Sequence, residues 1–275
     1  MTNTSEPYID DLLYKLSYGE MLYKDDYPQL SSNDLKQIKM IIFNEKHHKL
    51  IKPLLYKLYS YIGSENMLYC VVNIGDLKLV RRKLQSNDPK EKMLFRMIDG
   101  VYNKLDNSIE YKHKSDISHE LLHLASTKPT KYNTGKKSGF SYVKGKQKHL
   151  EGMNEGYTEL LNRRIFFNEK YNTNSYRKKV YFMRLIELLY DDFKDMENDY
   201  FRANYKSFEN HLLNYLTLEE FNKLLLTFDK MDFLINEDEV REIFKLLKDI
   251  VRRTDDNEKI VLSKKYVDGY YKGRF

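Results

Sequence analysis

SHELLH, at residues 118–123, is the stretch of this chain that says most about its fold and chemistry. Positions four apart lie on one face of an α-helix, so His119 and His123 can direct ring nitrogens towards one metal ion. Glu120 lies about 100° round the helix from His119, where its carboxylate can reach a nearby water without becoming a ligand. The spacing HExxH therefore predicts a helix with two zinc ligands and a general base.

The flanking residues favour a half-buried helix at this position. Residues 108–112 alternate as a short strand does, and Ser115 and Asp116 are candidate N-caps. The helix should end before Pro129. An apolar stripe runs along it, formed by Ile117, Leu121, Leu124 and Ala125. The alternative is an ordinary amphipathic helix whose histidines are simply exposed or hydrogen-bonded.

A second helical pattern, GMNEGYTELL at residues 152–161, offers a third ligand. Glu155 and Glu159 are four apart and share a helix face. One carboxylate can bind metal while the other accepts a hydrogen bond from a ligand histidine and fixes its tautomer. By themselves these two glutamates would more simply form a solvated helix face. After HExxH, we expect them to complete a zinc site.

HELLH followed by NEGYTE resembles the gluzincin clan of zinc metallopeptidases, the thermolysin-like group. The resemblance implies one zinc ion per chain, held by His119, His123 and Glu155. It implies that Glu120 is the general base. Glu159 would be the hydrogen-bonding partner of a ligand histidine, expected to be His119.

The resemblance covers about residues 108–168, and the flanking segments match no family member. The longer motif HExxHxxGxxH is absent, because Ser126 and Pro129 stand where its glycine and third histidine would be. No Gly-x-Met-x-Asn motif, which would anchor a substrate amine, precedes HELLH. The sequence thus leaves endopeptidase and aminopeptidase activity open.

These residues predict a zinc metallopeptidase, a hydrolase that acts on a peptide or protein substrate through zinc-activated water, with Glu120 as general base. The alternative is a non-catalytic, metal-stabilised regulatory or interaction domain that retains the peptidase fold. A purely structural zinc site favours cysteine ligands and has no need of Glu120.

Two residues are candidates for stabilising an oxyanion. Tyr142 is expected in the loop before the Glu155 helix, and His211 on a later helix; either can equally be a structural residue. Tyr157 is expected in the core, and Gly156 is expected to permit close helix approach.

Composition excludes several classes of protein. With 41% hydrophobic residues and 24 tyrosines, the 275-residue chain can bury a sizeable core. Cys70 is the single cysteine, so we expect no internal disulfide, a reducing compartment and a core position for this residue. Residues 1–10 lack a signal-peptide pattern, and no apolar run could span a bilayer. A cytoplasmic location, with no membrane partner, is therefore expected.

The net charge of +6 is modest, which argues against nucleic acid as a partner. Seven lysines and no acid lie in residues 128–148, together with Gly135, Gly139 and Gly145. This segment is interpreted as a mobile insertion. It would be either a lid or charged wall beside the cleft, or a solvated connector.

The overall prediction is an α+β fold in which helices predominate, with a small sheet beside the HExxH helix, a zinc cleft and a helical C-terminal lobe. Residues 1–107 form an N-terminal helical region with a few strands, 108–168 the zinc-binding core and 169–275 the C-terminal lobe, expected to pack as one unit. Strands are predicted at 67–74, 108–112 and 259–262. Helices are predicted at 7–24, 31–62 (broken near Pro53), 90–105, 116–127, 151–168, 176–196, 205–215, 217–229 and 237–252.

Overall fold

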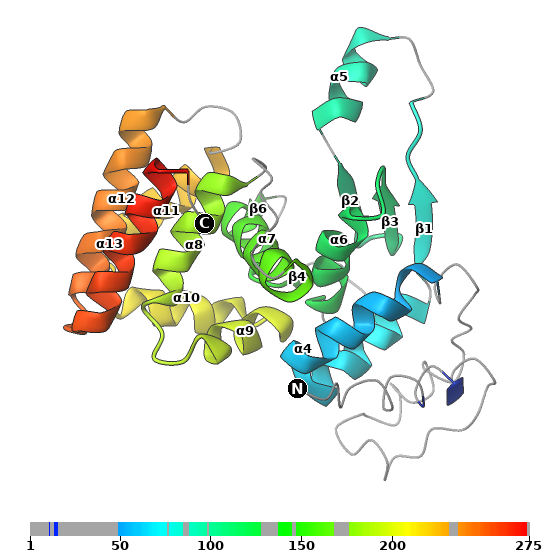
Figure 1. The fold of residues 1–275 in the computed structure, drawn as a ribbon, viewed down its shortest axis with the longest axis horizontal. Coiled ribbons are helices and arrows are strands. Elements are labelled where there is room, and N and C mark those ends of the chain that lie inside the picture. Colours follow the sequence, from blue (N-terminus) through cyan, green and yellow to red (C-terminus); the bar gives the residue numbers. More distant parts are fainter. Residues whose placement is uncertain are drawn as a thin grey trace. The chain divides into compact units, whose positions relative to one another are not determined.

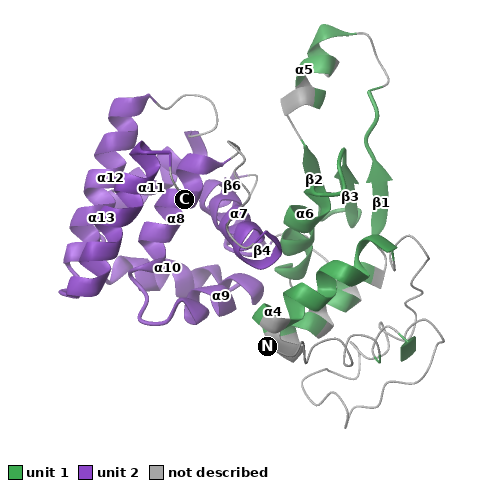
Figure 2. Cartoon of the chain, viewed as in Figure 1, with its two compact units in different colours: residues 1–135 green, residues 136–275 purple. Residues whose placement is uncertain are grey.

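The computed structural model describes residues 11, 14–15, 49–75, 77–84, 88–97, 99–127, 137–144, 147–167, 176–230 and 236–273. The chain divides into two compact units, residues 1–135 and 136–275 (Figure 2). This division falls inside the segment predicted as the zinc-binding core. The described residues are mostly helical and contain two small three-stranded sheets (Figure 1), so the predicted α+β class with predominating helices is confirmed.

Among these residues, no helix combines the length and apolar character needed to cross a bilayer. The helix predicted at 7–24, and the part of the helix predicted at 31–62 that precedes residue 49, fall almost entirely outside the described residues.

The sheet of the first unit is formed by β1 (Lys78–Arg81), β2 (Gly100–Asn103) and β3 (Ser108–Tyr111), in the order β1-β3-β2. The predicted strand at 108–112 is thus the central strand β3. It pairs in parallel with β1 and antiparallel with β2, which leaves β2 at an edge. Asn107 has a positive φ in the turn before β3, a conformation that asparagine tolerates well.

The HELLH residues lie on α6 (Asp116–Ala125), which packs against β2, β3 and α4 (Lys52–Gly75) (Figure 1). The predicted small sheet beside this helix is therefore present. The carboxylate of Asp116 accepts hydrogen bonds from the backbone N–H groups of Lys112 (3.1 Å) and His113 (2.7 Å). These bonds fix the turn between β3 and α6.

The predicted strand at 67–74 is wrong, because these residues belong to α4. An apolar run is compatible with a buried strand or a buried helix, and the spacing of its buried members is helical. Among the residues of the run whose burial is described, Met67, Cys70, Val71 and Ile74 are fully buried. Cys70 is thus a core residue, as predicted, and burial raises the pKa of its thiol. A turn at Ile51 precedes α4, so the interruption predicted near Pro53 is confirmed.

The helix predicted at 90–105 is too long. It corresponds to α5 (Pro89–Met97), and the chain then continues as β2 from Gly100. Glycine disfavours a helix interior, and the Val101-Tyr102 pair after it favours a strand.

The second unit begins with an antiparallel sheet of β4 (Lys137–Ser138), β5 (Ser141–Lys144) and β6 (Gln147–His149). The described part of the lysine-rich segment therefore forms a small sheet, and its interpretation as a mobile insertion stays a prediction. Gly139, with φ of 55°, makes the turn from β4, and Phe140 is buried beside it.

The rest of the second unit is helical (Figure 1). The segment predicted as one helix at 176–196 is interrupted at residues 188–192. The strand predicted at 259–262 is wrong, since Asp256 caps a helix there by accepting the N–H groups of Glu258 and Lys259. The helices are α7 (Glu151–Phe166), α8 (Arg177–Glu187), α9 (Phe193–Phe201), α10 (Tyr205–Leu213), α11 (Leu218–Lys230), α12 (Glu237–Arg252) and α13 (Asn257–Tyr271).

Candidate metal centre

The two histidines of HELLH direct their Nε2 atoms at the same point. These atoms are 3.2 Å apart, and the side chains of His119 and His123 are 9% and 7% exposed. Two nitrogen ligands of one tetrahedral zinc, each about 2.0–2.1 Å from it, lie roughly 3.3 Å apart. The donor pair therefore fits zinc, and its burial disfavours the interpretation of α6 as a helix with solvated histidines.

The C-terminal end of α6 is held by several hydrogen bonds. The hydroxyls of Ser126 (3.1 Å) and Thr127 (2.7 Å) donate to the carbonyl of His123. Asn73, on α4, donates through Nδ2 to the carbonyls of Leu124 (3.1 Å) and Thr127 (2.6 Å). The carbonyl of Leu124 also accepts the backbone N–H of Thr127 (3.1 Å), so Asn73 adds long-range hydrogen bonds to this helix end. Asn73 thus fixes the helix that carries the histidines, a role that sequence reasoning missed.

Glu120 points towards the edge strand of the sheet. Its Oε2 accepts a 2.6 Å hydrogen bond from the backbone N–H of Tyr102, on β2, and the residue is 7% exposed. Its Oε1 lies beside Gly100. The carboxylate predicted to be the general base is therefore held by the backbone of β2. Neither Tyr102 nor Gly100 belongs to a recognisable motif.

In the second unit, Glu155 lies half-buried on α7. Its motif neighbours fix this helix to the elements around it. The Oδ1 of Asn154 accepts the N–H of Phe140 (2.9 Å) at the turn between β4 and β5. The hydroxyl of Thr158 shares a 2.7 Å hydrogen bond with that of Tyr200, on α9. The asparagine and threonine of NEGYTE thus have structural roles.

Glu159 is buried and makes an ion pair on its own helix. Its Oε1 accepts from Nε of Arg163 (2.7 Å), and its Oε2 from Nδ2 of Asn162 (3.2 Å). Arg163 is fully buried, so this ion pair is shielded from solvent. Sequence reasoning missed Arg163, although the spacing of four residues could have indicated it. The pairing of Glu159 with His119 stays a prediction.

Gly156 has the expected packing role. A Cβ atom there would lie 2.8 Å from Cβ of Lys179 and 3.1 Å from Cγ of Met183, both on α8. The absence of a side chain therefore lets α8 approach α7 beside Glu155. Tyr157 is fully buried, as predicted.

The two candidate oxyanion donors have local partners. Tyr142 lies on β5 rather than in a loop and stacks on Tyr205, with ring centroids 3.9 Å apart. Burial, aided by Glu209, raises the pKa of Tyr142. His211 stacks on Tyr190 (3.7 Å), and its Nε2 lies 3.0 Å from the carbonyl oxygen of Leu189.

These contacts within the second unit explain the positions of the Tyr142 and His211 side chains. Their part in oxyanion stabilisation stays a prediction.

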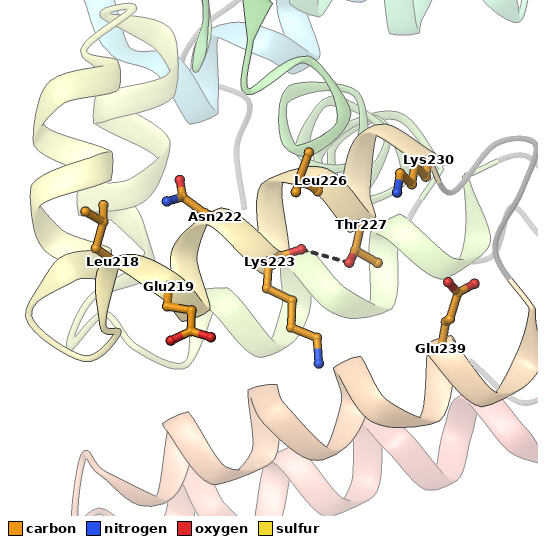
Figure 3. Close-up of a pocket in the computed structure, with 8 residues that line it drawn as sticks. All are labelled: Leu218, Glu219, Asn222, Lys223, Leu226, Thr227, Lys230 and Glu239. Atoms are coloured by element: carbon orange, nitrogen blue, oxygen red, sulfur yellow. Dashed lines mark hydrogen bonds between the residues drawn. The ribbon is translucent and has the colours of Figure 1, made fainter.

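A groove of about 810 Å³ lies on the surface of the second unit, along α11 (Figure 3). Acids and bases are mixed in its lining, and none of the predicted site residues is among them, so the groove is assigned no role in the chemistry. It is lined by Leu218, Glu219, Asn222, Lys223, Leu226, Thr227, Lys230 and Glu239.

No protein-family model, curated protein or solved structure matches this chain. The two motifs and the geometry around them therefore carry the functional argument.

Proposed function

We propose that this chain is a zinc-dependent peptidase in which His119, His123 and Glu155 hold the metal and Glu120 is the general base. The observation that carries the proposal is the 3.2 Å separation between the Nε2 atoms of the two buried histidines on α6, together with the Glu120 carboxylate held by the backbone N–H of Tyr102. When bound, zinc would supply Lewis acidity towards a peptide carbonyl and towards water.

The donor set supports a catalytic rather than a structural zinc. The three side chains supply two imidazole nitrogens and one carboxylate oxygen. Catalytic zinc has three protein ligands and an open position, whereas structural zinc has four and favours cysteine. The only cysteine, Cys70, is buried in α4. Glu155 is assigned as third ligand on the resemblance of NEGYTE to the second gluzincin motif.

Glu120 has the position and chemistry of a general base. It follows a proposed ligand directly in the chain, and a glutamate carboxylate is a group that can take a proton from water. In the proposed reaction it accepts the proton of the attacking water and passes it to the departing amine. This role requires a fixed carboxylate, which the contact with Tyr102 supplies.

The proposal is tested with ligand variants measured by elemental mass spectrometry and by cleavage of a fluorogenic peptide library. Wild type should contain about one zinc per chain and lose cleavage with a chelator. His123→Ala and Glu155→Ala should lose both zinc and cleavage. Glu151→Ala is the matched control, because it removes an acid that pairs with Lys148 at the surface of the same helix.

Two results would count against the proposal. Full zinc content in Glu155→Ala would remove Glu155 from the site. Zinc in the wild type without cleavage of any library member would favour the non-catalytic regulatory domain instead.

A further inference from the structure

The contact between Glu120 and the edge strand β2 suggests how the proposed base is held in place. We propose that the backbone N–H of Tyr102 is a positioning group for Glu120, and that residue 100 is glycine because a side chain there would displace the carboxylate. The role of this contact in catalysis rests on the proposed peptidase function. The existence of the contact is independent of that function.

The hydrogen bond is short and its donor is rigid. Tyr102 N lies 2.6 Å from Oε2 of Glu120, and Tyr102 belongs to the ladder with β3, where it stands opposite Ile109. A glutamate side chain has three rotatable bonds, and one charge-assisted hydrogen bond to a fixed backbone donor selects a few of its rotamers. A general base gains from this restriction because proton transfer requires a defined distance to the water.

Tyr102 is itself anchored, and the anchors lead back to α6. Its hydroxyl donates to Oδ1 of Asn107 (3.1 Å), and burial raises its pKa to about 12. Asn107 donates through Nδ2 to the carbonyl of Asn73 (2.6 Å). Asn73 in turn donates to the carbonyls of Leu124 and Thr127 at the end of α6. This set of hydrogen bonds ties β2 to both ends of the HELLH segment.

Gly100 supplies the space that Glu120 occupies. A Cβ atom at residue 100 would lie 3.0 Å from both Cγ and Oε1 of Glu120, and 3.3 Å from Cβ of Asp116. Such separations are shorter than ordinary van der Waals contacts of about 3.5–4.0 Å. Asp116 is bound by two backbone N–H groups, so relief would come from Glu120. Gly100→Ala should therefore shift the carboxylate by tenths of an ångström.

The contact can be measured without any assay of activity, by amide hydrogen exchange of Tyr102 in the full chain. In wild type this amide should exchange slowly although β2 is an edge strand. Glu120→Ala should speed its exchange about tenfold or more, the size expected from loss of a charge-assisted hydrogen bond. Glu110→Ala is the matched control, because it removes the same charge from β3 of the same sheet. Equal exchange in wild type and Glu120→Ala would overturn the proposal.

The catalytic meaning is tested by comparing two substitutions at one position. Tyr102→Ala removes the side chain and keeps the N–H, whereas Tyr102→Pro removes both, and proline is tolerated on edge strands. With similar thermal stability and zinc content in both variants, kcat of Tyr102→Pro should be about tenfold or more below that of Tyr102→Ala, and KM should be similar. Equal kcat values would show that the N–H does not position the base.

The variant Gly100→Ala tests the position of the Glu120 carboxylate independently of the Tyr102 variants. It should lower kcat while zinc content is retained, and Val101→Ala, which shortens an exposed side chain on the same strand, should not. If the wild type had no peptidase activity, both the proposed function and the role of the contact in catalysis would be contradicted. Hydrogen exchange of Tyr102 would still decide whether the contact exists.

Discussion

Single side chains around α6 show why the candidate metal site depends on residues outside its motif. The spacing of HELLH brings the two imidazoles together, but the position of the helix end depends on Asn73, 51 residues away from Leu124 in the chain. The direction of Glu120 likewise depends on Tyr102 and Gly100. A motif therefore names the chemical groups, and tertiary contacts set their geometry.

At the residue scale, Asn73→Ala should destabilise the first unit. The substitution removes the two hydrogen bonds from Asn73 to the end of α6, and a hydrogen bond of this kind contributes about 0.5–1.5 kcal/mol. Chemical denaturation should show this loss, and zinc affinity should fall with it. Asn222→Ala, at an exposed position on α11, is the control. Unchanged stability in Asn73→Ala would mean that this anchor is dispensable.

Elements that could be predicted from the sequence are those whose signals are local. HELLH predicts α6, although the candidate cap Ser115 makes no side-chain cap bond, and the glutamates of NEGYTE predict α7. The helices predicted at 205–215, 217–229 and 237–252 correspond to α10, α11 and α12. The Met67–Val72 run was mistaken for a strand because it is apolar on all sides. The tail at 259–262 was mistaken for a strand although Asp256 caps a helix there.

Of the candidate site, the side chains of HELLH could be predicted, and their anchors could not. Asn73, Tyr102 and Gly100 act through contacts distant in the chain, which no local spacing reveals. The ion pair of Glu159 with Arg163 has a local spacing but depends on burial that a helix pattern does not specify.

At the element scale, Gly156→Ala should separate α7 from α8. Alanine favours an exposed helix interior over glycine by about 1 kcal/mol. Here the added Cβ would overlap Lys179 and Met183, and overpacking of this kind costs roughly 1–3 kcal/mol. The steric cost should exceed the gain, so thermal denaturation should show a net loss of stability. A stabilised variant would contradict the packing role of Gly156.

A second element-scale prediction concerns the bidentate ion pair between α11 and the end of α12. Arg253 donates to both carboxylate oxygens of Glu220 (2.8 and 2.5 Å), and this pairing lowers the pKa of Glu220 from 4.5 to about 2. Because the pKa in the folded state is the lower one, the stabilisation is fully present above about pH 4.5 and is lost as pH falls towards 2.

Chemical denaturation at several pH values between about 2 and 7 tests whether stability falls with pH as this pKa shift predicts. Glu220→Gln should lower stability at pH 7 and make the decline below pH 4.5 less steep than in wild type. Glu219→Gln removes the same charge from the same helical turn and should leave the pH dependence as it is. Parallel curves for wild type and Glu220→Gln would contradict the assignment.

At the scale of the whole molecule, the proposed zinc should stabilise the folded state, because its ligands are brought together only when the chain is folded. Free zinc at a hundred times its Kd contributes about 2.7 kcal/mol. A chelator should lower the Tm by several degrees in wild type and in Glu120→Gln, but not in Glu155→Ala. Calorimetry with and without chelator provides the measurement. A chelator effect that persists in Glu155→Ala would assign the third ligand elsewhere.

The most direct test of the central claim compares wild type with Glu120→Gln for zinc content and for cleavage of the peptide library. The account predicts about one zinc per chain in both proteins, chelator-sensitive cleavage by wild type, and a rate about 10²- to 10⁴-fold lower in Glu120→Gln. Cleavage by pure Glu120→Gln at the wild-type rate would contradict the role of Glu120. Failure of reconstituted wild type to bind zinc would contradict the metal centre itself.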